Sequence, residues 1–362
     1  MGSILALKNY YKAIGVMSGT SLDGLDLAFC EYSKQGQDWR YTIRNAECVN
    51  YGDNLTKQLK AATKIQSMDL LELDVQLGRF IGREINQFLM KTGCKPDFIA
   101  SHGHTVFHQV KKGYSYQLGD GQTIAKQTGL TVVNDFRTKD IAYGGQGAPL
   151  VPKGDELLFA DYDICVNLGG IMNFSCKQNG ERIASDLTCC NMLLNHLAGK
   201  RKVKYDENGR WASNGSINHK LLKKLNTLSY VHLPFPKSTG YEWFLDDVLP
   251  ILNSFQDCPL EDLLCTAVHH IADQLYKPIK LIGIKCARVL LTGGGANNTF
   301  LTSTIKSKTN AHVIIPNAQL INYKESLVFG LLGVLRMRGE TNCLASATGA
   351  VMDTCGGVVY SP

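Results

Sequence analysis

The chain has 362 residues, of which 44% are apolar and 19% charged, a composition typical of a globular protein. Its net charge is +6, from 38 Lys and Arg against 32 Asp and Glu. This excess is small and scattered along the chain, which argues against a nucleic-acid partner. The length is sufficient for two domains, each with its own hydrophobic core.

The sequence also indicates the compartment. The N-terminal residues include no apolar segment typical of a signal peptide, and no stretch approaches the roughly 20 apolar residues that span a bilayer. The 12 cysteines include no C-x-x-C pair. Cys30, Cys165 and Cys286 lie in apolar runs, which favours buried thiols over disulfides or zinc sites. We therefore expect a cytoplasmic protein that does not bind a membrane.

The first element in chain order is a predicted β-hairpin at residues 13–32. Two short apolar runs flank a polar turn that contains Gly19 and Gly24. Glycines allow backbone N–H groups to approach a ligand closely, and consecutive turn amides can bind an anion. Asp23 and Asp26 would suit a phosphate that carries Mg²⁺. By itself, the hairpin is explained equally well as an ordinary polar turn.

An α/β domain is predicted to follow this hairpin. Residues 55–92 show helical spacing of apolar residues, and residues 96–100 and 130–133 are short buried strands. Each of these strands is followed by polar residues, Ser101 to Thr105 and Asn134 to Arg137. In open α/β sheets the carboxyl ends of strands are where ligands bind.

The second half of the chain repeats this pattern. Residues 163–176 again form an apolar run, a Gly-Gly turn and a second apolar run, 150 positions after Gly19 (Gly169). Helices are predicted at 260–276, ending at Pro278, and at 324–338, and a strand at 289–291 leads into a third glycine turn. We infer an internal duplication into two similar domains.

The three glycine turns fit neither common phosphate-binding signature. The chain has no Gly-Lys-Ser/Thr and no G-x-G-x-x-G that opens a helix after a strand. Paired glycine hairpins in a duplicated α/β chain are instead the arrangement of the actin, Hsp70 and sugar-kinase superfamily.

Seven motifs make a closer resemblance apparent. They are IGVMSGTSLDGLD (14–26), SHGHT (101–105), NDFRTKDIAYGGQGAPLVP (134–152), NLGGIMN (167–173), KSTGYEWF (237–244), LLTGGGANNTFL (290–301) and KESLVFGLLG (324–333). Over nearly its whole length the chain resembles the anhydro-N-acetylmuramic acid kinase family. The resemblance implies a duplicated actin-like (ribonuclease H-like) α/β fold with an interdomain active-site cleft. We place the first domain at residues 1–155 plus about 345–362, and the second at 156–344.

The resemblance also implies the reaction. Such enzymes use ATP and Mg²⁺ to phosphorylate O6 of 1,6-anhydro-N-acetylmuramic acid while water opens the anhydro ring, in recycling of cell-wall sugar. The residues expected at ATP are Gly19, Thr20, Ser21, Leu22, Asp23, Gly24, Leu25, Asp26, Gly169, Gly170, Gly293, Gly294 and Gly295, with Asp23 also at Mg²⁺. The partner is then a small-molecule sugar, and the chain could form a homodimer.

Ring opening by water requires a carboxylate base. The family carries this Asp in a Phe-Asp-Thr-Gly-Pro-Gly-Asn stretch, which matches Ser185 to Asn191 here and assigns the base to Asp186. Asp186 and Asn191 are kept, but residues 187–190 read Leu-Thr-Cys-Cys. The missing glycines put the local backbone in doubt. On sequence grounds alone, capping a helix at residues 191–198 is the more common role for an Asp at position 186, and only the family resemblance favours the base.

The substrate-binding residues that we expect are His102, Thr105, Arg137 and Glu325. Arg137 suits a carboxylate or phosphate, or else forms an ion pair with Asp135 or Asp140. Glu325 lies near the site by resemblance, or caps the last helix.

Other functions remain open on the sequence. His102, His104 and His108 could hold zinc in a hydrolase, although the family usually has Gln at position 104. The altered residues 187–190 keep open a kinase of the same fold that acts on another sugar or acyl acceptor. A non-catalytic nucleotide-binding protein is a further alternative.

Overall fold

The computed structural model describes residues 8–19 and 22–362, and these divide into two compact units. The first comprises Met1–Leu158 with Tyr323–Pro362, and the second Phe159–Asn322. In the first unit the strands are β1 (Tyr10–Ser18), β2 (Leu25–Gln35), β3 (Asp38–Val49), β4 (Phe98–Gln109), β5 (Tyr114–Leu118), β6 (Val132–Asn134) and β12 (Val358–Tyr360). Its helices are α1 (Gly52–Ala61), α2 (Ser67–Thr92), α3 (Gly121–Thr128), α4 (Thr138–Ala142), α5 (Val151–Leu158) and α14 (Ala345–Thr348), with most of α13 (Ala318–Arg338).

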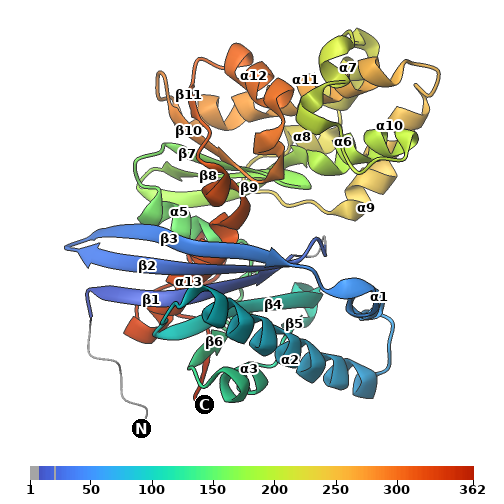
Figure 1. Cartoon of the computed structure of the whole chain (residues 1–362). Helices are drawn as coiled ribbons and strands as arrows, with labels where there is room; N and C mark the ends of the chain where they lie inside the picture. The colour runs from blue at the N-terminus through green and yellow to red at the C-terminus, as the bar shows by residue number, and fades with distance from the viewer. Residues whose placement is uncertain (1–7, 20–21) are drawn as a thin grey trace. The chain divides into compact units, whose positions relative to one another are not determined.

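The second unit has its own sheet and helices (Figure 1). Its strands are β7 (Ile164–Leu168), β8 (Ile171–Gln178), β9 (Glu181–Cys189), β10 (Arg288–Thr292) and β11 (His312–Ile314). Its helices are α6 (Asn191–Ala198), α7 (His219–Asn226), α8 (Ser229–His232), α9 (Tyr241–Trp243), α10 (Leu249–Asn253), α11 (Leu260–Ile282) and α12 (Thr299–Lys308).

The two sheets share one topology. The first has the order β12-β6-β4-β1-β2-β3, with β5 paired to β4, and the second has the order β11-β10-β7-β8-β9. In both, the first three strands are antiparallel neighbours, and two later strands add in parallel to the free side of the first strand. This repetition confirms the predicted duplication and the actin-like α/β fold. The cleft between domains stays a prediction.

Side chains that alternate along the strands of the first sheet pack against helices on both of its faces. Ile14 and Val16 of β1 are fully buried in a cluster with α2 and α3. Gly15 lies between them and so faces the other side of the sheet. A Cβ at Gly15 would lie 1.8 Å from the backbone oxygen of Ser326 in α13, so glycine is what permits helix and strand to meet. The sheet is therefore enclosed by α2 and α3 on one face and α13 on the other.

The second domain boundary differs from our prediction, because the chain returns to the first unit at Tyr323 rather than at about residue 345. The backbone of α13 leaves helical geometry at Tyr323. Beyond it, α13 packs on the first sheet, where the buried Tyr32 hydroxyl donates to Leu327 O over 2.6 Å. The first boundary, at Leu158, is close to the predicted residue 155.

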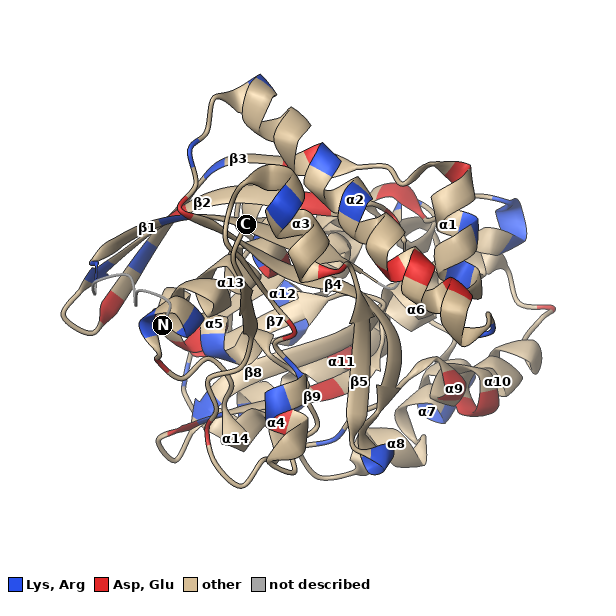
Figure 2. Cartoon of the chain, turned by 90° about the horizontal axis from the view of Figure 1, so that it is seen from below, with Lys and Arg blue, Asp and Glu red and all other residues tan. Residues whose placement is uncertain are grey.

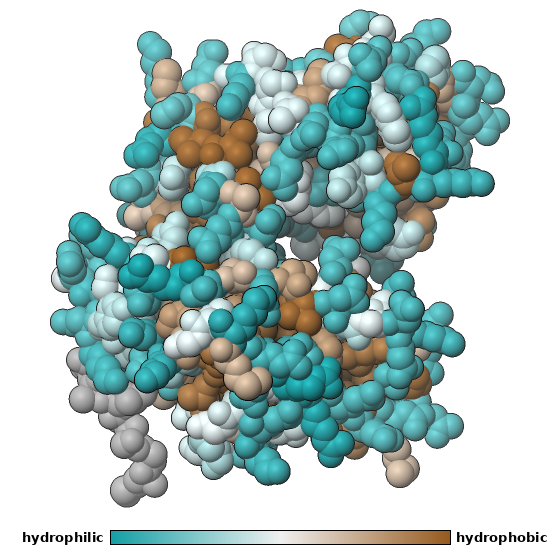
Figure 3. Space-filling view, viewed as in Figure 1, coloured by the Kyte–Doolittle hydropathy of each residue, from teal (hydrophilic) through white to brown (hydrophobic). Residues whose placement is uncertain are grey.

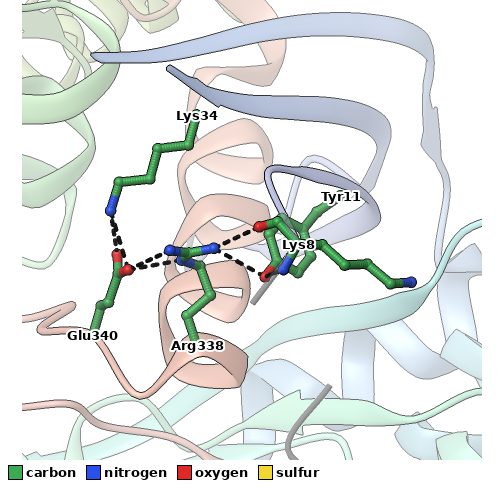
Figure 4. Close-up of polar contacts among 5 residues, drawn as sticks. All are labelled: Lys8, Tyr11, Lys34, Arg338 and Glu340. Carbon is green, nitrogen blue, oxygen red and sulfur yellow. Dashed lines mark hydrogen bonds and ion pairs between the residues drawn. The ribbon is translucent and has the colours of Figure 1, made fainter. Parts of the chain in front are cut away.

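The end of α13 is fixed to the first sheet by charged groups (Figure 4). The Arg338 guanidinium donates to Lys8 O over 2.6 Å, to the Tyr11 hydroxyl over 3.1 Å and to Glu340 over 2.8 Å. Lys34 of β2 reaches the same Glu340 carboxylate at 3.1 Å. Hydrogen bonds tie residues 338–340 to β1 and β2.

Two helix predictions need correction. The predicted helix 55–92 is divided, because α1 ends at Ala61 and α2 begins at Ser67. Pro278 was expected to end its helix, but α11 continues to Ile282 and ends at Gly283, whose φ is +65°. Proline removes only one hydrogen bond and can be accommodated where packing holds the helix, and Pro278 is buried.

The surface carries charges of both signs. Figure 2 shows Lys and Arg on the same helices as Asp and Glu, for example on α1 and α2. The face seen in Figure 3 is largely hydrophilic, with apolar side chains in separate small patches.

Among residues 8–19 and 22–362, no helix has the length and apolar character needed to cross a bilayer.

We expect Glu340→Gln to destabilise the protein in a pH-dependent way. Burial raises the pKa of Glu340, but hydrogen bonds from Arg338 and Lys34 outweigh this and hold it below the usual 4.5. A lowered pKa in the folded state stabilises it above pH 4.5, and this contribution disappears as pH falls through the folded pKa. Urea unfolding should show a loss of about 1 kcal/mol at pH 7. At pH 3 the difference from wild type should be smaller.

The matched control is Glu72→Gln, an exposed residue of α2. It should change stability little at either pH. A Glu340→Gln effect as large at pH 3 as at pH 7 would contradict the ionic origin of the contact.

Candidate active site

The turn between β1 and β2 is anchored by a buried hydroxyl network. The Tyr51 hydroxyl donates to Ser18 Oγ over 2.7 Å and lies 3.0 Å from Gly24 O. Ser18 Oγ also lies 3.0 Å from Nδ1 of His104. Thus both ends of the predicted phosphate-binding turn are fixed, at Ser18 and Gly24. Thr20 and Ser21 lie outside the described residues.

Three carboxylates follow this turn or face it. Asp23 is exposed, Asp26 is half-buried, and Glu325 approaches Asp26 from α13. Burial raises the pKa of Asp26, and Asp23 adds to this effect. Burial likewise raises the pKa of Glu325; Asp26 adds to this effect, while Lys324 and Arg137 oppose it. Carboxylate oxygens fit Mg²⁺, which binds through one or two carboxylates and substrate phosphates.

His102 and Arg137 form one rigid group. Nδ1 of His102 lies 2.9 Å from Gly103 O and must donate, which leaves Nε2 to accept from Arg137 at 2.7 and 3.1 Å. Burial, together with the Arg137 charge, lowers the pKa of His102 well below its usual value. Arg137 also donates to Gly147 O over 2.5 Å. Both nitrogens of the neutral imidazole are engaged, so neither is left for zinc.

The ion pair considered for Arg137 is not formed. Asp135 accepts instead from Thr138, and Asp140 accepts from the Gly147 amide over 2.7 Å and from the Thr348 hydroxyl over 2.8 Å. Burial lowers the pKa of Arg137 to about 10, and Glu325 opposes this effect. Arg137 is thus a half-buried cation that lacks an ion-pair partner within 4 Å among the described residues.

The predicted loop at Ser101 to Thr105 is part of strand β4, which runs on to Gln109. Thr105 accepts a weak hydrogen bond from Gln117 of β5 at 3.4 Å. His108 contacts Ser115 at 3.1 Å; burial lowers the pKa of His108, and the charge of Arg137 adds to this effect. No cluster of three His, Cys, Asp or Glu in the described parts of the chain could hold a metal ion.

In the second unit, two of the three glycine turns meet. A Cβ at Gly293, whose φ is +80°, would lie 2.3 Å from Oδ1 of Asn167 and 2.9 Å from the carbonyl carbon of Leu168. Gly295 is equally close to Leu168. Leu168 is followed directly by Gly169 and Gly170, and both Gly170 and Gly294 are exposed. These turns form a surface of accessible backbone that side chains would obstruct.

Asn191 joins these turns to the strand that carries the candidate base. Its amide side chain donates to Leu168 O over 2.9 Å, and its backbone N–H donates to Gly169 O over 3.0 Å. The backbone N–H of Cys190 donates to Gly170 O over 2.8 Å. The end of β9 is therefore attached to the Gly169-Gly170 turn in spite of the altered residues 187–190.

Asp186 lies in β9 and is not a helix cap; α6 begins at Asn191 after Cys190, which makes no side-chain cap. Its Oδ2 accepts from the Thr239 amide over 3.0 Å and from the Ser238 hydroxyl over 3.3 Å. Oδ1 accepts no hydrogen bond from the described residues. Burial raises the pKa of Asp186, and the Thr239 and Ser238 bonds oppose this effect. One oxygen is fixed and the other is open, the arrangement that a general base needs.

Ser238 and Thr239 are functional candidates that residue-by-residue reasoning missed. They belong to the KSTGYEWF motif, which carried the resemblance but was given no role. The backbone of this segment pairs with β9, because the Asp186 N–H donates to Lys237 O over 3.0 Å. The motif is visible in the sequence, but only the fold shows that Ser238 and Thr239 are neighbours of Asp186, from which they are 52 and 53 positions away along the chain.

The comparisons with known proteins agree with this geometry. The family model for anhydro-N-acetylmuramic acid kinase matches residues 11–362. The chain belongs to this family. It is 35% identical to the anhydro-N-acetylmuramic acid kinase of Pasteurella multocida, over 97% of this chain and 96% of that protein. It is 32% identical to that of Shewanella sediminis, over 97% and 98%. The predicted family and the prediction that the chain is a kinase are confirmed.

Solved structures are more distant. An activator of 2-hydroxyisocaproyl-CoA dehydratase from Clostridium difficile, with bound ADPNP, has 13% identity and a TM-score of 0.43, over 90% of this chain and 96% of that one. A ROK family glucokinase from Streptomyces griseus has 12% identity and a TM-score of 0.39, over 89% and 98%.

We expect Gly293→Ala to destabilise the second unit. The substitution combines an unfavourable φ with a clash against Asn167 and Leu168, so it should cost about 2 kcal/mol or more of unfolding free energy. The control is Gly283→Ala, whose φ is +65° but whose Cβ would meet nothing within 4 Å. It should cost about 1 kcal/mol. Equal losses for the two variants in urea unfolding would show that close packing at Gly293 is unimportant.

Proposed function

We propose that this protein hydrolyses the 1,6-anhydro ring of 1,6-anhydro-N-acetylmuramic acid and transfers the γ-phosphoryl group of ATP to O6. The products are N-acetylmuramic acid 6-phosphate and ADP. The observation that carries the proposal is the carboxylate of Asp186, of which only Oδ2 accepts hydrogen bonds from the described residues, at the position where this family has its base. Its raised pKa and open Oδ1 suit proton abstraction from water.

In the proposed mechanism, Asp186 Oδ1 accepts a proton from water as the water oxygen bonds to the anomeric carbon. The bond between that carbon and O6 breaks, and O6 keeps the electron pair. O6 then bonds to the γ-phosphorus, whose bond to the β–γ bridging oxygen of ATP breaks to release ADP. Capture of O6 removes the need for a separate general acid, and in-line placement provides most of the acceleration of phosphoryl transfer.

The nucleotide is proposed to lie along the glycine turns. The support is the exposed backbone of Gly170 and Gly294 and the close packing of Gly293 and Gly295 on Leu168. The fixed turn between Ser18 and Gly24 would bind phosphate through its amides. Asp23 and Asp26 would hold Mg²⁺, which neutralises charge on the transferring phosphate.

The sugar is proposed to bind at His102, Thr105, Arg137 and Glu325. Arg137 is half-buried, has no ion-pair partner among the described residues and is held by His102, so its guanidinium is oriented to bind an anionic group such as the lactyl carboxylate. Glu325 is close enough to raise the pKa of Arg137 and could accept from a sugar hydroxyl.

A cytoplasmic location is also proposed. All 12 cysteines are free thiols, and seven of them are buried. Free thiols persist in a reducing compartment.

Asp186→Asn should abolish ADP release and sugar phosphate formation together, since Asn cannot accept the proton. A residual rate of about 1% or less is expected. Both products should be measured in one assay by mass spectrometry. Asp257→Asn, which removes an exposed carboxylate of the same unit, should leave the rate unchanged. Sugar phosphate that still forms from Asp186→Asn at the wild-type rate would overturn the proposal.

Arg137→Lys should raise KM for the anhydro-sugar by about tenfold, because lysine keeps the charge but loses the paired guanidinium geometry. KM for ATP should not change. Arg79→Lys, an exposed position of α2, is the control and should match wild type in both values. An unchanged KM for the sugar in Arg137→Lys would remove Arg137 from the substrate site.

A further inference from the structure

A buried chain of polar side chains crosses the second unit and ends beside the candidate base. Thr188 of β9 lies 3.0 Å from Nε2 of His270 on α11. Nδ1 of His270 lies 2.7 Å from Oδ1 of Asn226, whose Nδ2 donates to Asp273 over 2.9 Å. Lys308 of α12 forms an ion pair with the same Asp273. Thr188 and His270 are each 1% exposed, so this polar pair lies in the core.

The direction of every hydrogen bond in this chain is determined. Because Asn226 donates its amide to the Asp273 carboxylate, its Oδ1 must accept, both from His270 and from Gln274 at 2.8 Å. His270 therefore carries its proton on Nδ1. Burial lowers the pKa of His270 to about 4, so the ring is neutral and Nε2 is a lone-pair acceptor. The Thr188 hydroxyl must then donate to it.

The position of Thr188 in β9 matters because a β-bulge precedes it. Asp186 pairs with Asn173 of β8 and Thr188 pairs with Met172, so Leu187 is the extra residue between them. A bulge bends a strand and changes the direction of neighbouring side chains, and bulges occur often beside active sites. The bulge breaks the alternation of β9, and residues 187–189 are all buried.

A bulged strand keeps one orientation only if hydrogen bonds hold the residues on both sides of the bulge. On the near side, Asp186 is fixed by the Lys237 carbonyl and the Thr239 amide. On the far side, the backbone of Cys189 pairs with Ile171, and the Thr188 side chain adds a hydrogen bond to His270. Position 188 is a glycine in the family stretch that residues 185–191 resemble, so this side-chain bond belongs to the altered sequence of this chain.

We infer that His270 is a positioning residue: by accepting the Thr188 hydroxyl it fixes the strand beyond the Leu187 bulge and with it the direction of the Asp186 carboxylate. This inference rests on the proposed role of Asp186 as the base. His270 touches no substrate; it acts through Thr188. The chain from Asn226 to Lys308 holds the ring in the tautomer that this bond requires.

The test is the turnover of Thr188→Val, which keeps the shape of the side chain but removes its hydroxyl. kcat should fall about tenfold, the effect of one lost hydrogen bond, while KM for ATP and for the sugar stay unchanged. Thr188→Ser, which restores the donor, should keep kcat within about twofold of wild type. Rates are taken per folded enzyme, well below the unfolding temperature.

A double-mutant cycle tests whether His270 acts through Thr188. His270→Leu, which removes the acceptor, should lower kcat about tenfold, and Thr188→Val added to it should lower kcat no further. Losses that multiply would overturn the inference, as would a wild-type kcat in Thr188→Val. If Thr188→Val does not fold, a wild-type kcat in His270→Leu would overturn the inference in the same way.

Two further variants identify the cause. Thr304→Val removes a buried hydroxyl that donates within α12, to Phe300 O over 2.8 Å; it should lower stability but not kcat. An equal fall in kcat for Thr304→Val would show a general loss of rigidity and overturn the role of His270. If Asp186→Asn is inactive while Thr188→Val keeps the wild-type kcat, the positioning role of His270 is overturned but the role of Asp186 as the base is not. A fully active Asp186→Asn overturns the base and the positioning role together.

Discussion

The proposed chemistry depends on a carboxylate that is held on one side only. Asp186 accepts from Thr239 and Ser238 through Oδ2, and Oδ1 stays open. If both oxygens accepted hydrogen bonds from the protein, the pKa of Asp186 would be lowered and no oxygen would be left to accept from water. If neither oxygen accepted a hydrogen bond, the carboxylate would be free to rotate. The structure achieves this balance with a strand bulge at Leu187 and a neighbouring segment that supplies both donors.

The duplicated topology explains why binding groups accumulate at strand ends. In the second unit, β7 and β10 are parallel neighbours, so the turns that follow them, at Gly169 and Gly293, lie at the same edge of the sheet. In the first unit, β1, β4 and β6 are likewise parallel neighbours, and His102, which lies within β4, meets Arg137, which follows β6. We propose that this arrangement presents nucleotide-binding turns in the second unit and an anion-binding pair in the first.

Much of this could be predicted from sequence, for identifiable reasons. The hairpins and the duplication follow from apolar runs around glycine turns, and the family follows from motifs such as IGVMSGTSLDGLD. Contacts between distant segments could not be predicted, because sequence does not state that residues 238 and 239 pair with residue 186, or that His270 meets Thr188. The helix-cap alternative for Asp186 and the end of α11 at Pro278 were local arguments that tertiary packing overrode.

The most direct test of a water-activating Asp186 is the fate of the water oxygen. In ¹⁸O-water, early product analysed by mass spectrometry should carry one label at the anomeric carbon and none in the phosphate. Unlabelled N-acetylmuramic acid 6-phosphate incubated in the same water measures the background exchange of the anomeric hydroxyl. Label in the phosphate group, or an anomeric label no greater than this background, would contradict the account.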